Sequence, residues 1–177
     1  MTPDLIAVVG PSGAGKDTLM AAAVKARPDL CVVRRVITRP ETAGGEDFEG
    51  VTPQEFAARK AAGQFALDWQ AHGLSYGIPR DQLDRPGPIL FNGSRAMLGA
   101  AMQQFSGLRV LLVTAPTAVL AARLAARGRE SVADIAERLE RAAFDLPAGI
   151  TASEVINDGT PATGAIRFLA ALQRERA

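Results

Sequence analysis

The amino-acid sequence predicts an α/β fold in which a parallel central sheet carries helices on both faces, giving three layers. Short apolar runs alternate with segments of helical periodicity along the chain, as in strands that are joined by crossover helices. A glycine-rich segment separates the first apolar run from the first helical one. The chain has 177 residues, a length that favours one domain with its own hydrophobic core.

In its first half, the chain is expected to begin the sheet and then to leave it for an irregular insertion. Proline, glycines and acidic residues are concentrated in 38–50, which predicts a loop there. The expected elements are, in order, a strand at 5–9, a helix at 16–27, a strand at 30–37, a loop at 38–50, a helix at 53–63 and a strand, turn and strand over 65–78.

The second half is expected to complete the sheet. Gly128 is predicted to end one helix and Pro161 to open the last, because glycine favours helix ends and proline favours helix starts. The expected elements are, in order, a strand at 88–91, a helix at 95–105, a strand at 108–114, helices at 117–127 and 132–144, a strand at 154–156 and a helix at 161–174.

Composition and charge exclude several classes of protein. Apolar residues make up 47% and charged residues 22%, which rules out a disordered or fibrous chain. The net charge of +1 provides no overall field for nucleic acid or an anionic membrane. The longest apolar stretch, 110–122, is shorter than the about 20 residues of a membrane-spanning helix. With one cysteine and no export signal, we expect a cytoplasmic protein without disulfides.

The most specific motif is a phosphate-binding loop, Gly10-Pro11-Ser12-Gly13-Ala14-Gly15-Lys16. It matches G-x-x-x-x-G-K and lies between the first strand and the first helix, which is the context that this motif requires. The glycines let backbone N–H groups face a phosphate, and the helix start adds its positive dipole end. Lys16 can then reach the β- and γ-phosphates, so the loop predicts ATP binding.

The position after Lys16 departs from the motif, which expects a serine or threonine there as a Mg²⁺ ligand. Asp17 stands at that position and Thr18 follows it. Asp17 is expected to hold Mg²⁺ directly or through water, or else Thr18 caps or packs while water supplies the ligand. Both residues are predicted to belong to the ATP site, with Mg²⁺ accompanying ATP.

Together with this loop, the order of motifs resembles the guanylate kinase superfamily over nearly the whole chain. The resemblance includes the pair Thr38-Arg39, the glycine-rich loop 44–51, the turn 73–77 and the arginines around Gly128. It implies a P-loop fold similar to that of nucleoside-monophosphate kinases, with a core at 1–37 and 86–177, an acceptor-binding flap at 38–85 and a helical lid at about 124–142.

Several positions that would bind GMP in that superfamily are altered. Phe48 stands where a tyrosine would hold the substrate phosphate, and Leu67 stands where a glutamate would bind guanine. Phe91 and Gly93 replace two aspartates after the central strand. A site for guanine would leave several buried groups without partners, each at a cost of about 1–3 kcal/mol. GMP is therefore expected to be a very poor acceptor.

The altered segments instead resemble ribose 1,5-bisphosphate phosphokinases of phosphonate catabolism. Matching phrases are Gly-Lys-Asp-Thr-Leu at 15–19, Val-Ile-Thr-Arg-Pro at 36–40, Trp-Gln-Ala-His-Gly-Leu at 69–74 and Asn-Gly-Ser-Arg at 92–95. The resemblance implies phosphoryl transfer from ATP to ribose 1,5-bisphosphate, which yields 5-phosphoribosyl 1-diphosphate, a precursor of NAD. A phosphate oxygen needs no general base as nucleophile, so positioning and charge neutralisation would carry catalysis.

Arginine and polar side chains in the flap and after the central strand are the candidates for holding a phosphosugar. The predicted acceptor-binding residues are Arg34, Arg39, Glu46, Asp47, His72, Tyr76, Asn92, Ser94 and Arg95. Arg35 and Arg80 fall in or beside the same region. Three alternatives stay open: His72 as a turn residue, Tyr76 and Trp69 as packing residues, and Glu46 with Asp47 as solvated loop charges.

The lid resemblance implies arginines that neutralise the transferring phosphoryl group when the lid closes. The predicted catalytic residues are Lys16, Arg127, Arg129 and Arg138. Arg123 either joins this group or is an exposed helical arginine. Asn157 is expected to border the adenine of ATP, with a tight turn as the alternative.

Two other functions stay open at this point. One is a guanylate or other nucleoside-monophosphate kinase, and the other is a guanylate-kinase-like binding module that has lost catalysis. Such modules discard the phosphate loop, which is intact here. The expected ligands are ATP and a phosphosugar, without nucleic acid or membrane, and a homodimer is left open.

Overall fold

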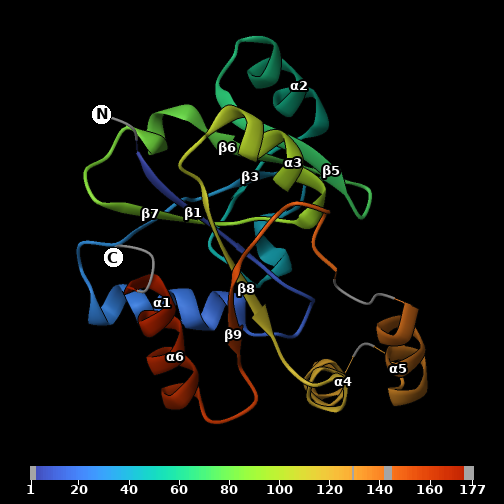
Figure 1. Ribbon diagram of the computed structural model, residues 1–177. Helices are drawn as coiled ribbons and strands as arrows, with labels where there is room; N and C mark the ends of the chain where they lie inside the picture. Colours follow the sequence, from blue (N-terminus) through green and yellow to red (C-terminus); the bar gives the residue numbers. More distant parts are fainter. Residues whose placement is uncertain (1–2, 129, 142–144, 174–177) are drawn as a thin grey trace.

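The computed structural model describes residues 3–128, 130–141 and 145–173 (Figure 1). The core strands are β1 (Asp4–Val9), β2 (Cys31–Val32), β7 (Pro88–Asn92), β8 (Arg109–Thr114) and β9 (Ser153–Ile156). The helices around them are α1 (Lys16–Ala26), α3 (Arg95–Gln104), α4 (Thr117–Ala126), α5 (Val132–Arg141) and α6 (Pro161–Gln173). These bounds confirm most of the predicted elements, while the predicted helix ends at 144 and 174 lie outside the described residues.

The core strands form a sheet of five parallel strands within the described part of the chain. Their order is β2-β7-β1-β8-β9, so β1 lies in the middle with β7 and β8 on either side. The carboxyl ends of β1 and β7 are adjacent, because Val8 pairs with Asn92. Ligands of open α/β sheets bind at this edge. The predicted α/β class with a parallel central sheet is confirmed.

The central strand is buried on both faces. Leu5, Ala7 and Val9 pack on the side of α3 and the flap, whereas Ile6 and Val8 pack on the side of α1 and α6. A strand that is covered on both faces needs a continuous apolar run. This is why 5–9 was recognisable in the sequence, and it fixes the loop that follows Val9 at the edge of the sheet.

A second, smaller sheet forms the flap. Its strands are β3 (Val36–Ile37), β4 (Glu49–Gly50), β5 (Phe65–Ala71) and β6 (Leu74–Pro79), in the order β4-β3-β6-β5. Helix α2 (Pro53–Ala61) begins with a capping box in which Thr52 and Glu55 hydrogen-bond each other's backbone. The segment 38–50, which was predicted as a loop throughout, contains a 3₁₀ turn at Glu41–Ala43 and the short strand β4.

The prediction of one strand over 30–37 is wrong. β2 pairs with β7 in the core sheet, whereas β3 pairs with β6 in the flap sheet. The physical reason lies at Arg34, whose backbone N–H donates to Gln82 Oε1 at 2.8 Å and whose carbonyl accepts from Gln82 Nε2 at 3.0 Å. A side-chain amide thus replaces a neighbouring strand there, and the chain passes from one sheet to the other.

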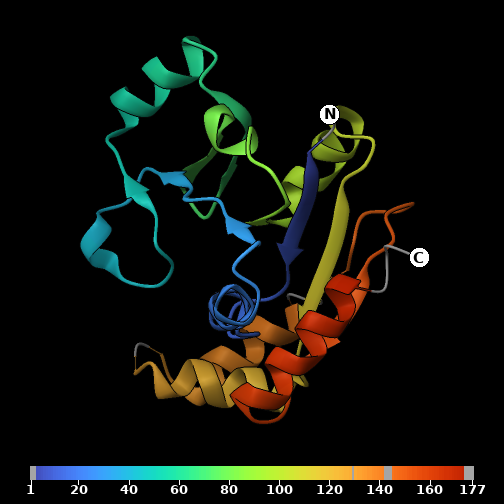
Figure 2. The ribbon, with the colours of Figure 1, turned by 90° about the vertical axis from the view of Figure 1, so that its left-hand side faces the viewer.

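Helices α4 and α5 follow β8, and the segment 124–142 that was predicted to be a lid comprises the end of α4 and α5. Figure 2 shows them on the same side of the core as the loop that contains the 3₁₀ turn of the flap. Gly128, at φ 72°, ends the first lid segment in a left-handed conformation. Ile135 anchors α5 because its side chain is fully buried. None of the helices formed by the described residues has the length and apolar character needed to cross a membrane.

Candidate active site

The phosphate loop lies at the carboxyl end of β1 and leads into α1. Two of its glycines are required by close neighbours. A Cβ at Gly10 would lie 2.0 Å from the carbonyl oxygen of Val113 on β8, and a Cβ at Gly15 would lie 2.6 Å from Asn157 Nδ2. Gly15 also has φ 89°, which side chains rarely adopt. The predicted loop therefore has the backbone that its sequence requires.

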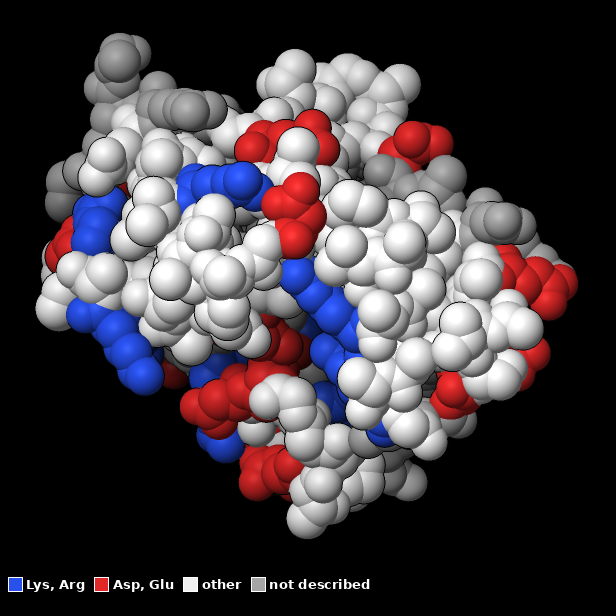
Figure 3. Space-filling model, turned by 90° about the horizontal axis from the view of Figure 1, so that it is seen from below, with Lys and Arg blue, Asp and Glu red and all other residues white. Residues whose placement is uncertain are grey.

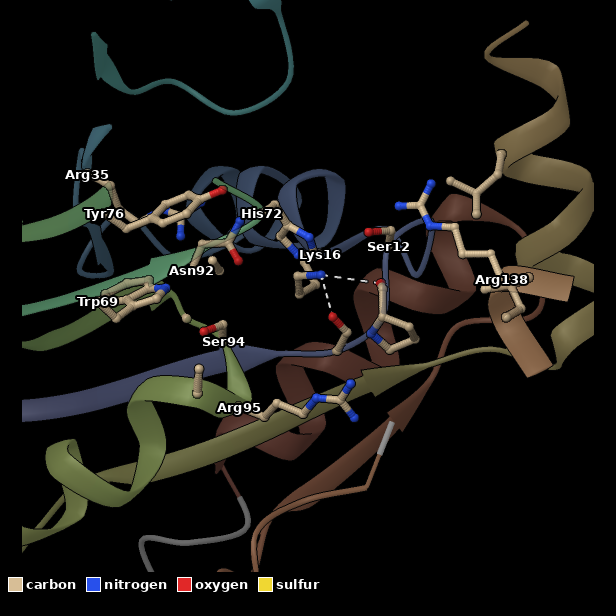
Figure 4. A pocket seen from close by; sticks show the side chains of 17 residues that line it. Ser12, Lys16, Arg35, Trp69, His72, Tyr76, Asn92, Ser94, Arg95 and Arg138 are labelled. Carbon is tan, nitrogen blue, oxygen red and sulfur yellow. Dashed lines mark hydrogen bonds between the residues drawn. The ribbon is translucent and has the colours of Figure 1, made fainter. Parts of the chain in front are cut away.

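Lys16 turns back over this loop. Its Nζ donates to the carbonyl oxygens of Gly10 at 2.8 Å and Pro11 at 3.3 Å (Figure 4). Burial lowers the pKa of Lys16 from 10.5 to about 8; Asp17 opposes this shift and the charge of Arg35 adds to it. The ammonium group is thus held where its charge is costly, and an anion beside it would restore its ordinary pKa.

Two side chains support the loop from below. Asn157 is buried and donates its Nδ2 to the carbonyl oxygen of Ala14 at 2.8 Å. Arg123 on α4 donates Nη1 to the Gly13 carbonyl at 3.2 Å and Nη2 to the Asn157 carbonyl at 2.7 Å. The alternative that Arg123 is an exposed helical arginine is therefore wrong. These contacts place Asn157 next to the phosphate loop, where its side chain hydrogen-bonds the backbone of the loop.

Asp17 and Thr18 occupy the first turn of α1. Asn92, at the end of β7, donates its Nδ2 to Asp17 Oδ1 at 2.9 Å. Both α1 residues line a cavity of about 330 Å³ beside the phosphate loop. The cavity is bordered by Ser12, Gly13, Gly15, Lys16, Asp17, Thr18, Gly45, Asn92 and Arg127. It offers a carboxylate, two hydroxyls and two cations next to the loop, which suits a triphosphate together with a hard metal ion.

A second cavity of about 360 Å³ shares Ser12, Lys16 and Asn92 with the first and extends toward the flap. We call it the acceptor cleft. It is lined by Gly10, Pro11, Ser12, Lys16, Arg35, Trp69, Ala71, His72, Tyr76, Asn92, Gly93, Ser94, Arg95, Ala96, Leu124, Arg138 and Leu139. Core, flap and lid all contribute, and Lys16 lies where the two cavities meet.

Most of the predicted acceptor residues are brought together by this cleft. His72, Tyr76, Asn92, Ser94 and Arg95 all line it, and Arg138 lines it from the lid. Figure 4 shows Tyr76 and Trp69 at one end, Arg138 at the other, and Lys16 between them. His72 lies in the turn between β5 and β6 with φ 53°, so its place in the turn and its place in the cleft are both observed.

Other predicted residues lie elsewhere. Arg34 and Asp47 form an exposed ion pair, with Arg34 Nε 3.0 Å from Asp47 Oδ1, and both line a third hollow against α1 that Asp17 and Asn92 also border. Arg39 lies over the ring of Phe48, 4.5 Å from its centroid, and donates to the Gly44 carbonyl at 3.0 Å. None of these three residues lines the acceptor cleft.

Two of the arginines that were predicted to act from the lid, Arg127 and Arg138, each border a cavity. Arg127 borders the cavity beside the phosphate loop. Arg138 Nη1 donates to Glu130 Oε1 at 3.0 Å on the surface of the lid. The prediction for Arg129 falls outside the described residues. Seen from below, basic side chains follow one another along a hollow of the surface, and acidic side chains lie at its edges (Figure 3).

Sequence reasoning did not select Arg35 as a binding residue. Arg35 is 6% exposed, yet it lines the acceptor cleft and is bound by Glu46 through both carboxylate oxygens. Glu46 was predicted to contact the acceptor or to be a solvated loop charge, and it is instead mostly buried against this arginine. The available signal was a pair of arginines between two apolar runs, which is unusual for a continuous buried strand.

Comparisons with known proteins find relatives that match nearly the whole chain. Ribose 1,5-bisphosphate phosphokinase PhnN of Ruegeria sp. strain TM1040 is 50% identical over 177 residues, covering 98% of this chain and 93% of that protein. A bifunctional ribose 1,5-bisphosphokinase-thymidine phosphorylase of Cupriavidus necator is 45% identical over 170 residues. That match covers 94% of this chain and 28% of the longer protein. No protein-family model matches the chain.

Among solved structures, guanylate kinase from Anaplasma phagocytophilum has the same fold. The two chains superpose with a TM-score of 0.64 at 18% sequence identity, covering 99% of this chain and 87% of the other. At this identity the likeness concerns the fold alone. It confirms the predicted guanylate-kinase-like architecture around the phosphate loop.

Proposed function

The chain belongs to the family of ribose 1,5-bisphosphate phosphokinases, and on this premise we propose that it transfers the γ-phosphoryl group of ATP to ribose 1,5-bisphosphate. The products are ADP and 5-phosphoribosyl 1-diphosphate. One observation carries the proposal beyond family membership: Lys16 lies where the phosphate-loop cavity meets a cleft that Arg35, Arg95 and Arg138 also line. A donor phosphate and an anionic acceptor can therefore meet at one ammonium group.

The acceptor supplies its own nucleophile. The second pKa of a phosphate monoester is near 6, so an oxygen of the 1-phosphate is already ionised at neutral pH. Catalysis then consists of holding two anions in line and neutralising the charge that they share. Lys16 exchanges the carbonyls of Gly10 and Pro11 for oxygens of the donor phosphates, and its charge remains beside the γ-phosphoryl group during transfer.

Mg²⁺ fits the donor set beside the loop. Asp17 and Thr18 present a carboxylate and a hydroxyl to the same cavity as Lys16, and these oxygen groups would hold Mg²⁺ directly or through water. When bound, Mg²⁺ neutralises charge on the β- and γ-phosphates. Asn92 holds the Asp17 carboxylate in place from the neighbouring strand.

The lid contributes the remaining charge. Arg127 borders the phosphate-loop cavity and Arg138 borders the acceptor cleft. Closing the lid brings guanidinium groups to the transferring phosphoryl group and excludes water, which would otherwise compete as acceptor. Arg129 is assigned to the same group by its position in the sequence.

Guanine has no polar partners at the altered positions. Phe48 is 3% exposed beneath Arg39, while Leu67 and Phe91 belong to the core cluster that packs on α3. These side chains carry no hydrogen-bonding group and offer guanine no hydrogen bond, so nucleoside-monophosphate kinase activity is not favoured. The intact phosphate loop with Lys16 also argues against a binding module without catalysis.

The reaction fixes the ligands that we expect. ATP and a phosphosugar bind to the two cavities, and neither nucleic acid nor a membrane takes part. A cytoplasmic location and a place in phosphonate degradation fit a substrate and product that carry several phosphates. A homodimer is compatible with these roles.

An acceptor panel tests the assignment. Initial rates with ATP and Mg²⁺ are compared for ribose 1,5-bisphosphate, GMP and AMP, with 5-phosphoribosyl 1-diphosphate measured directly as product. The kcat/KM for ribose 1,5-bisphosphate should exceed that for GMP by about 10⁴-fold, the scale of discrimination when a site with polar binding groups meets a ligand that leaves those groups unpaired. Comparable values for GMP would restore a nucleotide kinase.

A further inference from the structure

Arg35 is a buried cation at the flap end of the acceptor cleft. Its guanidinium carbon lies 4.9 Å from the ring centroid of Tyr76 and 5.8 Å from that of Trp69. The two rings are themselves stacked, with centroids 5.5 Å apart. A guanidinium group that lies against aromatic rings is held in one orientation, so little freedom is lost when it binds a ligand. Arg35 is therefore organised before any ligand arrives.

Glu46 uses only part of the donor capacity of Arg35. Nε donates to Glu46 Oε2 at 2.9 Å and Nη2 donates to Glu46 Oε1. A guanidinium group carries five N–H donors, so three are left over. Among the hydrogen bonds between described residues, those of the Arg35 side chain come from Nε and Nη2, and none comes from Nη1. The carboxylate thus fixes one edge of Arg35, and the other edge is left for an anion in the cleft.

Ser94 provides a second group without a partner among the residues that the structure describes. Its Oγ is buried, and no hydrogen-bond partner for it exists among the described residues. Ser94 precedes α3 but makes no side-chain capping bond to that helix. A buried hydroxyl without a partner is unusual. Figure 4 places Ser94 on the same side of the view as Trp69, and both residues line the acceptor cleft.

Arg35 and Tyr76 lie away from Lys16, beside which the reaction takes place. Phosphoryl transfer occurs beside Lys16, where the two cavities meet, while Arg35 and Tyr76 lie at the end of the cleft opposite Arg138. An acceptor with two phosphates needs a second anion site at a distance from the first. Arg and phosphate form strong hydrogen bonds because both are charged and the guanidinium fork matches phosphate oxygens.

We propose that Arg35, oriented by Glu46 and Tyr76, binds the phosphate of the acceptor that does not react, with Ser94 Oγ as a further donor. This inference rests on the proposed function and names the part of the substrate that the site selects. The flap end of the cleft then discriminates sugar bisphosphates from sugar monophosphates, while the reacting 1-phosphate stays beside Lys16.

Binding measurements without ATP test this subsite independently of turnover. Ribose 1,5-bisphosphate and ribose 1-phosphate are titrated into the wild type and into Arg35→Gln and Arg35→Lys. Arg35→Gln should raise the Kd for ribose 1,5-bisphosphate about 10- to 100-fold, the range for losing a charged hydrogen bond. It should change the Kd for ribose 1-phosphate by less than about threefold. Arg35→Lys, which keeps the charge without the fork, should fall between. The matched control is Arg59→Gln, since Arg59 is an ion-paired flap arginine that lines a different hollow with Glu49.

Ser94→Ala removes a hydroxyl that no described residue binds, so this variant keeps the fold even if thermal unfolding shows that Arg35→Gln does not. Ser94→Ala should raise the Kd for ribose 1,5-bisphosphate about three- to tenfold and leave the Kd for ribose 1-phosphate unchanged. Equal losses for both sugars in the Arg35 variants, or an unaffected bisphosphate in Ser94→Ala and Arg35→Lys, would overturn the subsite. Wild-type binding of both sugars with equal affinity would overturn it too. A wild type that prefers the bisphosphate but does not phosphorylate it would refute the reaction and leave the subsite standing.

Discussion

Asn92 at the end of β7 holds Asp17 at the start of α1, with Nδ2 of the amide 2.9 Å from Oδ1 of the carboxylate. The residue at the usual position of the Mg²⁺ ligand is therefore tied to the edge of the acceptor cleft. Thr18, its rival for this role, lines the same cavity without such a tie among the hydrogen bonds of the described residues. This difference separates the two candidates.

Asp17→Ala is expected to raise the Mg²⁺ concentration for half-maximal activity about tenfold, because a charged oxygen donor near the metal is lost. Thr18→Val should change it by less than about threefold. The measurement is a Mg²⁺ titration of initial rates at fixed ATP. A normal titration for Asp17→Ala with a shifted one for Thr18→Val would assign the metal side of the site to Thr18.

Lys16→Ala is expected to lower kcat by about 10²-fold or more, the scale for loss of a preorganised charge at a transition state. Its fold should persist, because Lys16 bonds only to carbonyl oxygens of its own loop in the hydrogen bonds observed. Lys25→Ala on the last turn of the same helix is the control, with unchanged rates expected. A folded Lys16→Ala variant with near-normal turnover would contradict the assignment of phosphoryl transfer.

ATP affinity is expected to fall as the pH rises above 8. Burial lowers the pKa of Lys16 to about 8 in the free protein, and bound phosphates favour its charged form. Above that pH, ATP binding requires Lys16 to take up a proton from the solvent, so affinity declines toward about tenfold per pH unit. Kd for ATP between pH 7 and 10 would test this, and Lys16→Met should show no such decline. A decline shared by Lys16→Met would locate the titration elsewhere.

The same pKa sets a dependence of stability on pH with a defined sign. Between pH 8 and 10.5 the unfolded chain keeps the proton of Lys16 and the folded chain loses it. The free energy of unfolding should therefore rise with pH across this window, relative to Lys16→Met. Below about pH 8 both states are protonated and the cost of burying the charge is fully present. Denaturant unfolding of both proteins at pH 7, 8, 9 and 10 measures the difference.

Arg138→Gln is expected to lower kcat by about 10²-fold with little change in the KM of either substrate. In the structure Arg138 is paired with Glu130 on the lid surface, and such exposed pairs contribute little to stability. Its charge would act mainly when the lid closes on the transferring group. Steady-state kinetics with each substrate varied decide the matter, and Arg27→Gln removes a paired arginine at the far end of α1 as the control. A raised KM for the phosphosugar with normal kcat would instead make Arg138 a ground-state binding residue.

The sequence predicted those parts of the site that depend on neighbouring residues. The strand at 5–9, the phosphate loop and the start of α1 are contiguous, and each is determined by local apolar pattern or by glycine geometry. Tyr76 and Asn92 were predicted because each lies in or at the end of a strand that the sequence pattern indicates. The resemblance of several short phrases then carried the substrate class.

The contacts that sequence reasoning missed join distant segments. The break between β2 and β3 depends on Gln82, which lies 48 residues after Arg34 and takes the place of a neighbouring strand. The burial of Arg35 depends on Glu46 and on two aromatic rings in β5 and β6. No local pattern reveals that one of two adjacent arginines turns into a cleft while the other pairs with Asp47 outside it.

The grip of Arg123 on the Gly13 and Asn157 carbonyls has a consequence for how the family can vary in length. Arg127 follows one helical turn later, so the number of residues between Arg123 and Arg127 determines the direction in which Arg127 faces. A single residue inserted or deleted between the two would rotate Arg127 by about 100° and turn it from the phosphates. We expect natural insertions and deletions in this region to fall after Gly128, where they leave the spacing between Arg123 and Arg127 unchanged.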